Sequence, residues 1–112
     1  MIDPSAFISA QNDPAFGDEG WLTFYLCGSF DQHKSMKVGL VALNAINLSG
    51  AEYGFVYAKV PTRLSEAEIR SLIEQVHGLA TEAGVEIDVI DLDASADVAQ
   101  SKFYTIWQAP PA

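Results

Sequence analysis

The stretch LSEAEIRSLIEQVHGLATEAG, residues 64–84, decides the fold. Ser65 is followed three residues later by Glu68, the spacing of a capping box, in which each side chain bonds to the backbone amide of the other residue. Gly84 stands where a helix commonly ends in a left-handed residue. Between these ends the apolar residues recur every three or four positions: Ile69, Leu72, Ile73, Val76, Leu79, Ala80 and Ala83. The pattern predicts a helix over residues 66–83 with one apolar face.

Four other segments are predicted to form strands, three of them because they are rich in aromatic and β-branched residues. The fourth directly follows the predicted helix. The segments are residues 21–26, 53–60, 87–92 and 103–107.

Residues 34–48 fit two structures. As a helix, the segment would start near Ser35 and end at Gly50; as a strand, it would use the alternation of Met36, Val38 and Leu40. We favour the helix, which gives the order β-α-β-α-β-β. This is an α+β two-layer sandwich, with a sheet of about four strands and two helices on one face. The strand alternative gives a larger antiparallel sheet with one main helix.

The aromatic side chains of the strands are predicted to gather on one face of the sheet. Successive side chains in a strand point to opposite faces, so residues in phase with Leu22 point at the helices and the others point away. Seven rings would then face away from the helices: Trp21, Tyr25, Tyr53, Phe55, Tyr57, Phe103 and Trp107. Soluble monomers rarely leave so large an apolar patch in water. We expect a cover, either the N-terminal segment or an extra hairpin of this chain, or another protein, most simply a second copy.

Length and composition indicate one globular domain over residues 1–112, with an irregular acidic segment at 1–19 and a frayed tail at 108–112. About half of the residues are apolar, which excludes intrinsic disorder. The formal net charge of −9 disfavours binding to nucleic acid or to an anionic membrane. Cys27 is the only cysteine, so no disulfide forms within the chain and the cytoplasm is the expected compartment.

Negative charge is concentrated in residues 64–101, where nine acidic residues face Arg70 alone. Such a run is commonly a solvated surface that keeps a protein in solution. The functional interpretation is a docking surface for a basic protein, because opposite charge speeds encounter and selects partners. The residues expected to carry it are Glu66, Glu74, Glu82, Asp91 and Asp93.

Three patterns resemble chemical sites, and each lacks a required part. Residues 91–97 place oxygen side chains at alternate positions, as the first half of a calcium loop does, but the second half is missing. Cys27, Asp31 and His33 are close in sequence without a known nucleophile motif, and His77 has no second metal ligand at a suitable spacing. We therefore predict no catalytic residue, no metal site and no cofactor, and leave open any chemical role of Cys27 or His33.

The helix and the GVEID stretch at residues 84–88 resemble slightly the end of the small acidic protein regulators of ribonuclease E, which bind their enzyme and inhibit it. The resemblance covers about one fifth of the chain. That family has a tryptophan soon after the aspartate, whereas Val89 and Ile90 follow here, so no site residue is transferred.

These features together predict a small acidic protein without enzymatic activity that binds another protein. It would act as an inhibitor, an immunity or anti-defence factor, or a regulator, and its partner would be basic and handle nucleic acids. The alternative is a dimeric α+β enzyme or small-molecule-binding protein. Its pocket would lie between aromatic walls formed by Tyr25, Tyr57 and Trp107, with His33 as the acid or base.

Overall fold

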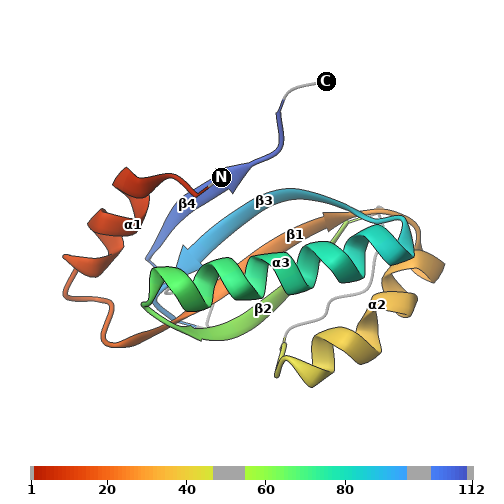
Figure 1. Ribbon diagram of the computed structural model, residues 1–112, viewed down its shortest axis with the longest axis horizontal. Helices are drawn as coiled ribbons and strands as arrows, with labels where there is room; N and C mark the ends of the chain where they lie inside the picture. Colours follow the sequence, from red (N-terminus) through yellow and green to blue (C-terminus); the bar gives the residue numbers. More distant parts are fainter. Residues whose placement is uncertain (1, 47–54, 96–101, 111–112) are drawn as a thin grey trace.

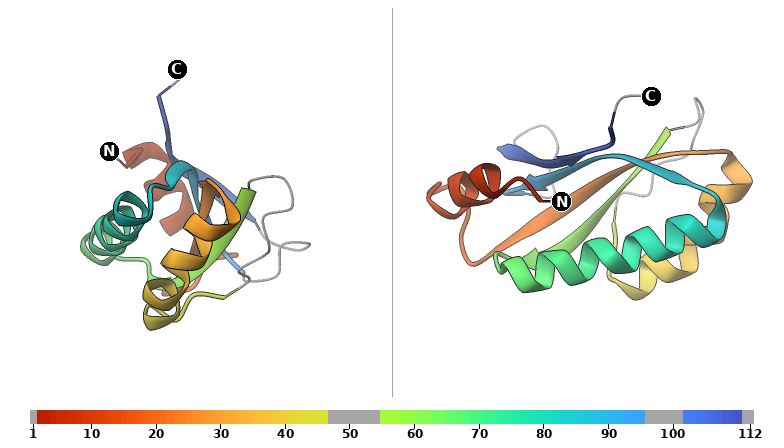
Figure 2. Two further views of the ribbon diagram at one scale, coloured as in Figure 1. Left: turned by 90° about the vertical axis from the view of Figure 1, so that its right-hand side faces the viewer. Right: turned by 45° about the horizontal axis from the view of Figure 1, so that its top comes forward.

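The computed structural model describes residues 2–46, 55–95 and 102–110 of the chain. Its elements are α1 (Pro4–Gln11), β1 (Glu19–Cys27), α2 (Phe30–Ala42), β2 (Phe55–Arg63), α3 (Glu66–Ala83), β3 (Glu86–Asp93) and β4 (Phe103–Gln108) (Figure 1). The four strands form one antiparallel sheet in the order β2-β1-β3-β4. Helices α2 and α3 cover the same face of this sheet (Figure 2), which confirms the predicted α+β fold. No helix within the described residues is long and apolar enough to cross a membrane.

Helix α3 has the predicted bounds. The hydroxyl of Ser65 accepts a hydrogen bond from the Glu68 amide at 3.4 Å, as predicted. The predicted return bond to the Ser65 amide is wrong, because the Glu68 carboxylate accepts from the amide of Arg63 instead, at 3.3 Å. Gly84 ends the helix with a φ of 74°, a left-handed conformation that glycine adopts without steric cost. Ile69, Val76 and Ala80 are buried, so the apolar face of the helix packs on the sheet as predicted.

Helix α2 confirms the helical interpretation over residues 34–42 but corrects its bounds. The helix begins at Phe30, because Ser29 and Gln32 form a full capping box with bonds of 3.2 and 2.8 Å. It ends at Ala42, and Asn44 then adopts a left-handed φ of 63°. The predicted end at Gly50 lies outside the described residues.

Helix α1 lies in the segment that we expected to be irregular. Asp3 caps it by accepting from the amides of Ser5 and Ala6, and Pro4 occupies the first turn, where its missing amide costs nothing. The Asp3 amide ties this end of the chain to β4 by donating to the carbonyl of Ile106 at 2.7 Å. Phe7 of α1 is buried in the core.

Asp13, just after α1, adds a polar connection to β4. Its Oδ2 accepts a hydrogen bond from the Tyr104 hydroxyl at 2.7 Å and lies 2.8 Å from Nζ of Lys102. The rings of Phe16 and Tyr104 also lie side by side, with centroids 5.9 Å apart. The N-terminal region therefore covers the β4 end of the sheet.

The core lies between the sheet and the helices α2 and α3. Leu22, Phe24 and Leu26 of β1 point into it, as their phase predicts. The expected position of Trp107 is wrong, because the β3–β4 register shifts between Ile90 and Asp91. Trp107 packs against the core and lines a hollow with residues of α3, so it lies on the helical side of the sheet.

Candidate functional site

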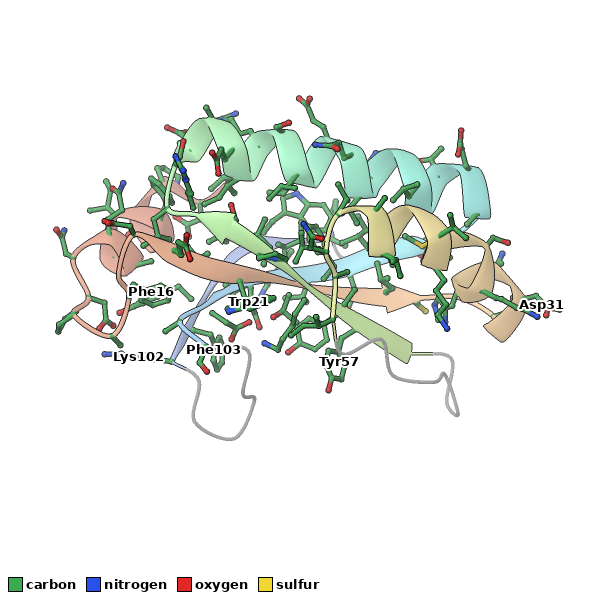
Figure 3. The ribbon with its side chains drawn as sticks, turned by 90° about the horizontal axis from the view of Figure 1, so that it is seen from below. Phe16, Trp21, Asp31, Tyr57, Lys102 and Phe103 are labelled. Atoms are coloured by element: carbon green, nitrogen blue, oxygen red, sulfur yellow. The ribbon has the colours of Figure 1, made fainter. Side chains whose placement is uncertain are left out.

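The face of the sheet turned away from α2 and α3 is called the open face below. It carries aromatic rings and a group of buried polar and charged side chains. Figure 3 shows Trp21, Tyr57 and Phe103 on this side. The strand registers place its residues in three rows: Pro61, Trp21, Asp93 and Phe103; then Lys59, Thr23, Asp91 and Thr105; then Tyr57, Tyr25 and Val89. The middle row is polar, and aromatic rings lie on both sides of it.

A buried group of polar side chains occupies the centre of the open face. We call it the lysine–aspartate cluster; its buried members are Lys59, Thr23, Asp93 and Asp91, and the half-buried Thr105 borders them. The Lys59 ammonium donates to Thr23 Oγ1 at 2.8 Å and to Asp93 Oδ2 at 3.0 Å, while the Thr23 hydroxyl donates to the same carboxylate oxygen. Charges this deeply buried are stable only when they are paired and hydrogen-bonded. Groups from two other strands, β1 and β3, therefore accept the hydrogen bonds of the Lys59 ammonium and balance its charge.

Within the cluster, Asp91 accepts fewer hydrogen bonds than Asp93. Its Oδ1 accepts from the Thr105 hydroxyl at 2.7 Å, and the residue is only 6% exposed. Burial raises the pKa of Asp91; the Thr105 hydrogen bond opposes this effect, the Asp93 charge adds to it, and Lys59 opposes it. Asp91 is thus a desolvated carboxylate beside an ion pair that is already formed.

Aromatic rings border the cluster. Tyr25 and Tyr57 face each other across β1 and β2 with ring centroids 6.3 Å apart. Trp21 is half-buried, whereas Phe103 is 56% exposed. Burial raises the pKa of the Tyr25 hydroxyl, and the negative charges of Asp91 and Asp93 raise it further. Of the predicted aromatic set, Trp21, Tyr25, Tyr57 and Phe103 lie on the open face, and Tyr53 and the Phe55 side chain are outside the described residues.

The predicted acidic residues fall into two groups on opposite sides of the sheet. Glu66, Glu74 and Glu82 are exposed on α3, whereas Asp91 and Asp93 are buried in the lysine–aspartate cluster. The period of two along β3 turns both aspartates toward the open face. The expected continuous acidic surface is therefore wrong for Asp91 and Asp93. The remaining surface, called the α3 acidic face, consists of the exposed Glu66, Glu68, Glu74 and Glu82.

Cys27 and His33, the thiol and imidazole that are close in sequence, do not belong to the lysine–aspartate cluster. Cys27 is exposed at the end of β1. His33 is buried in α2, and neither of its ring nitrogens has a hydrogen-bond partner, so the two residues do not form a nucleophile–base pair. Within the described residues, no group of three or more His, Cys, Asp or Glu side chains could hold a metal ion.

Sequence reasoning did not identify Lys59, Thr23 and Thr105 as site residues. Lys59 lies in the middle of β2, a strand otherwise rich in apolar residues, and its side chain is on the same face of the sheet as that of Tyr57. A lysine at such a position needs a buried acid, and the aspartates at 91 and 93 follow the same alternation in a later strand. This pattern in the sequence indicates a buried pair between Lys59 and one of the two aspartates, although it does not determine which strands are neighbours in the sheet.

Comparisons with models of known protein families, with curated proteins and with solved structures found no match.

Proposed function

We propose that this chain is a small acidic protein-binding module, an inhibitor or regulator that docks through the α3 acidic face on a basic surface of another protein. The observation that carries the proposal is the unequal charge along α3. The helix exposes four glutamates and one arginine, Arg70, whose guanidinium is paired with Glu66 at 2.9 Å. Its 18 residues extend for about 27 Å, the length scale of a protein docking site.

The charge of the whole chain favours a protein partner over nucleic acid. A net charge of −9 repels phosphate, but it attracts a surface rich in lysine and arginine. Such surfaces occur on proteins that handle nucleic acids, and an acidic helix can occupy them. Opposite charge raises the association rate and makes it depend on salt.

Two variants with the same change in net charge test this proposal. Glu66→Gln, Glu74→Gln and Glu82→Gln together remove three charges from the α3 acidic face. Asp18→Asn, Glu19→Gln and Asp31→Asn remove three from exposed positions elsewhere and serve as the control. Both variants and the wild-type chain would be immobilised and exposed to a nuclease-treated lysate, and the bound proteins would be quantified by mass spectrometry.

We expect basic proteins to be retained by the wild-type chain and by the control, to be lost from the α3 variant, and to elute as salt rises to about 0.5 M. With a purified partner, the α3 variant should associate about tenfold more slowly. Equal retention by all three chains, or binding that resists salt, would contradict docking through α3.

The second candidate is a small-molecule-binding protein. The open face favours it, because Tyr25 and Tyr57, two of the predicted pocket walls, border buried carboxylates. Trp107 is not a wall of this site, since it lies on the helical side. The sequence-based version of this function requires a dimer. Light scattering, which measures the molar mass in solution, would test for it.

A further inference from the structure

We propose that α2 is a latch that opens in acid: protonation of the buried His33 imidazole releases this helix from the end of α3 and exposes the apolar surface beneath it. The sheet and α3 stay folded in the open state. The inference does not depend on the docking function proposed for the α3 acidic face.

His33 is a buried polar side chain without a hydrogen bond. It is 9% exposed, and neither Nδ1 nor Nε2 has a partner among the described residues. A neutral imidazole carries one donor and one acceptor, whereas protonation makes both nitrogens donors and adds a positive charge. A buried charge without a partner is far more costly than the buried neutral ring. Uptake of a proton therefore favours a state in which the ring reaches water.

The packing around His33 couples the ring to the docking of α2. A Cβ added at Gly28 would lie 2.8 Å from Gln32 Oε1, 3.2 Å from Val85 Cγ2 and 3.5 Å from His33 Nε2. A Cβ added at Gly84, the end of α3, would lie 2.9 Å from Gln32 Nε2. The first turn of α2 is thus fitted closely against the ends of β1 and α3. The ring can reach water by movement of this turn away from them.

The charged and titratable side chains of the segments that meet at this junction are themselves in water. Within the described residues they are Cys27, Asp31, Lys34, Lys37, Glu82 and Glu86, all exposed. Lys59 of β2 is bonded to Asp93 on the open face, on the other side of the sheet. Burial lowers the pKa of His33, and the positive end of the α2 dipole, one turn away, also disfavours a cation there.

Helix α2 is suited to move as a unit. Its buried side rests on Met36 and Leu40, whereas Val38 and Val41 are exposed on its outer side. Only two residues link the helix to β1, and it lies beside α3 at one end of the sheet (Figure 1). Elements with few buried apolar side chains open at a lower free energy than the rest of a fold. Opening of α2 would uncover Met36, Leu40 and the part of the core that they cover.

Hydrogen exchange resolved by residue tests the latch. Amide exchange of the wild-type chain would be followed at about pH 7.5 and about pH 5.5 and corrected for the intrinsic exchange rate. We expect the protection of the α2 amides to fall at least about tenfold in acid, while α3 and the strands keep theirs. The midpoint of this change should match the titration of the His33 ring followed by NMR.

Three variants assign the response to His33. His33→Leu and His33→Phe replace the ring with apolar groups that take up no proton, so the protection of α2 should be equal at both pH values. His77→Gln removes an exposed histidine of α3 and should respond as the wild-type chain does. A fluorescent dye that binds apolar surface should bind the wild-type chain and His77→Gln more strongly in acid, and the two His33 variants equally at both pH values.

Unchanged protection of α2 in acid would overturn the proposal. Equal loss of protection in all helices and strands would also overturn it, because the whole fold would then open rather than α2. A response that persists in His33→Leu or His33→Phe would assign the proton to another group. These measurements use neither a binding partner nor the glutamates of α3, so the latch and the α3 docking function can fail separately.

Discussion

Nζ of Lys59 lies 3.0 Å from Oδ2 of Asp93, and the two side chains are only 2% and 7% exposed. The pair joins β2 to β3, which are not neighbours in the sheet, by crossing over Thr23 of the intervening β1. Three strands are thus tied together at one buried point. An ion pair in this position specifies which strands align, because a shift of register would leave a buried charge without its partner.

Replacing one member of this pair should strongly destabilise the fold. Lys59→Met keeps most of the side-chain volume but leaves Asp93 without its cation, and we expect the free energy of unfolding to fall by about 3 kcal/mol. Urea denaturation of Lys59→Met, Asp93→Asn and the double variant measures the coupling. The double variant should lose less than the sum of the single losses, and additive losses would show that the two charges do not depend on each other.

Asp13 should make the attachment of α1 sensitive to acid. Its pKa is lowered from 3.8 to about 2, first by the Lys102 hydrogen bond, then by the Ala15 amide and the Tyr104 hydroxyl. A carboxyl group with a depressed pKa contributes stability that is complete above 3.8 and is lost as the pH falls toward 2.

Urea midpoints measured from pH 7 to about pH 2 check this expectation. Asp13→Asn should be less stable than the wild-type chain at neutral pH, and the difference should vanish between 3.8 and about 2. Asp18→Asn, an exposed control five residues later, should show no such convergence. A constant difference between Asp13→Asn and the wild-type chain would contradict the assignment.

Local signals made α3 the most predictable element of the fold. Ser65 and Gly84 mark both ends of α3, because a cap and a left-handed glycine act over a few residues. Ser29 with Gln32 carries the same kind of information for α2, and Asp3 with Pro4 does so for α1. The whole of α1 and the start of α2 were missed, because the apolar periodicity that follows these two caps is weak.

The candidate site was predicted only in part, because it depends on contacts between distant strands. The alternation within β1 correctly places Trp21 and Tyr25 on the open face. The position of Trp107 depends on a register shift in the β3–β4 pair, and an extra residue in a strand reverses the face of every residue after it. Likewise, the pairing of Lys59 with Asp93 requires the strand order, which single segments do not encode.

His33 should make the fold weaker below neutral pH. Burial lowers the pKa of its imidazole below 6.5, so the unfolded chain takes up a proton that the folded chain does not. The free energy of unfolding is therefore highest above 6.5 and falls as the pH drops below that value. His33→Leu should flatten this slope between about pH 7.5 and about pH 5.5, while His77→Gln, at an exposed position of α3, should keep it. Parallel slopes in all three chains would rule out His33 as the cause.

Two glycines in helices should respond in opposite ways to the same substitution. Alanine ordinarily stabilises a helix relative to glycine by about 0.5–1 kcal/mol. At Gly78 of α3 an added Cβ meets nothing within 4 Å, so Gly78→Ala should raise the free energy of unfolding by about that amount. At Gly39 of α2 the added Cβ would lie 2.4 Å from Leu79 Cδ2 and 2.8 Å from its Cδ1. Helices α2 and α3 approach closely at this point.

Because Leu79 must leave its position, Gly39→Ala should lower the free energy of unfolding by about 1 kcal/mol despite the higher helix propensity of alanine. Leu79→Ala provides the check, since truncating that side chain makes room for the new methyl group. In urea denaturation, Leu79→Ala should therefore cost less in the Gly39→Ala background than in the wild-type chain. If both glycine substitutions stabilise equally, the contact between Gly39 and Leu79 is not the constraint that sets the spacing of the two helices.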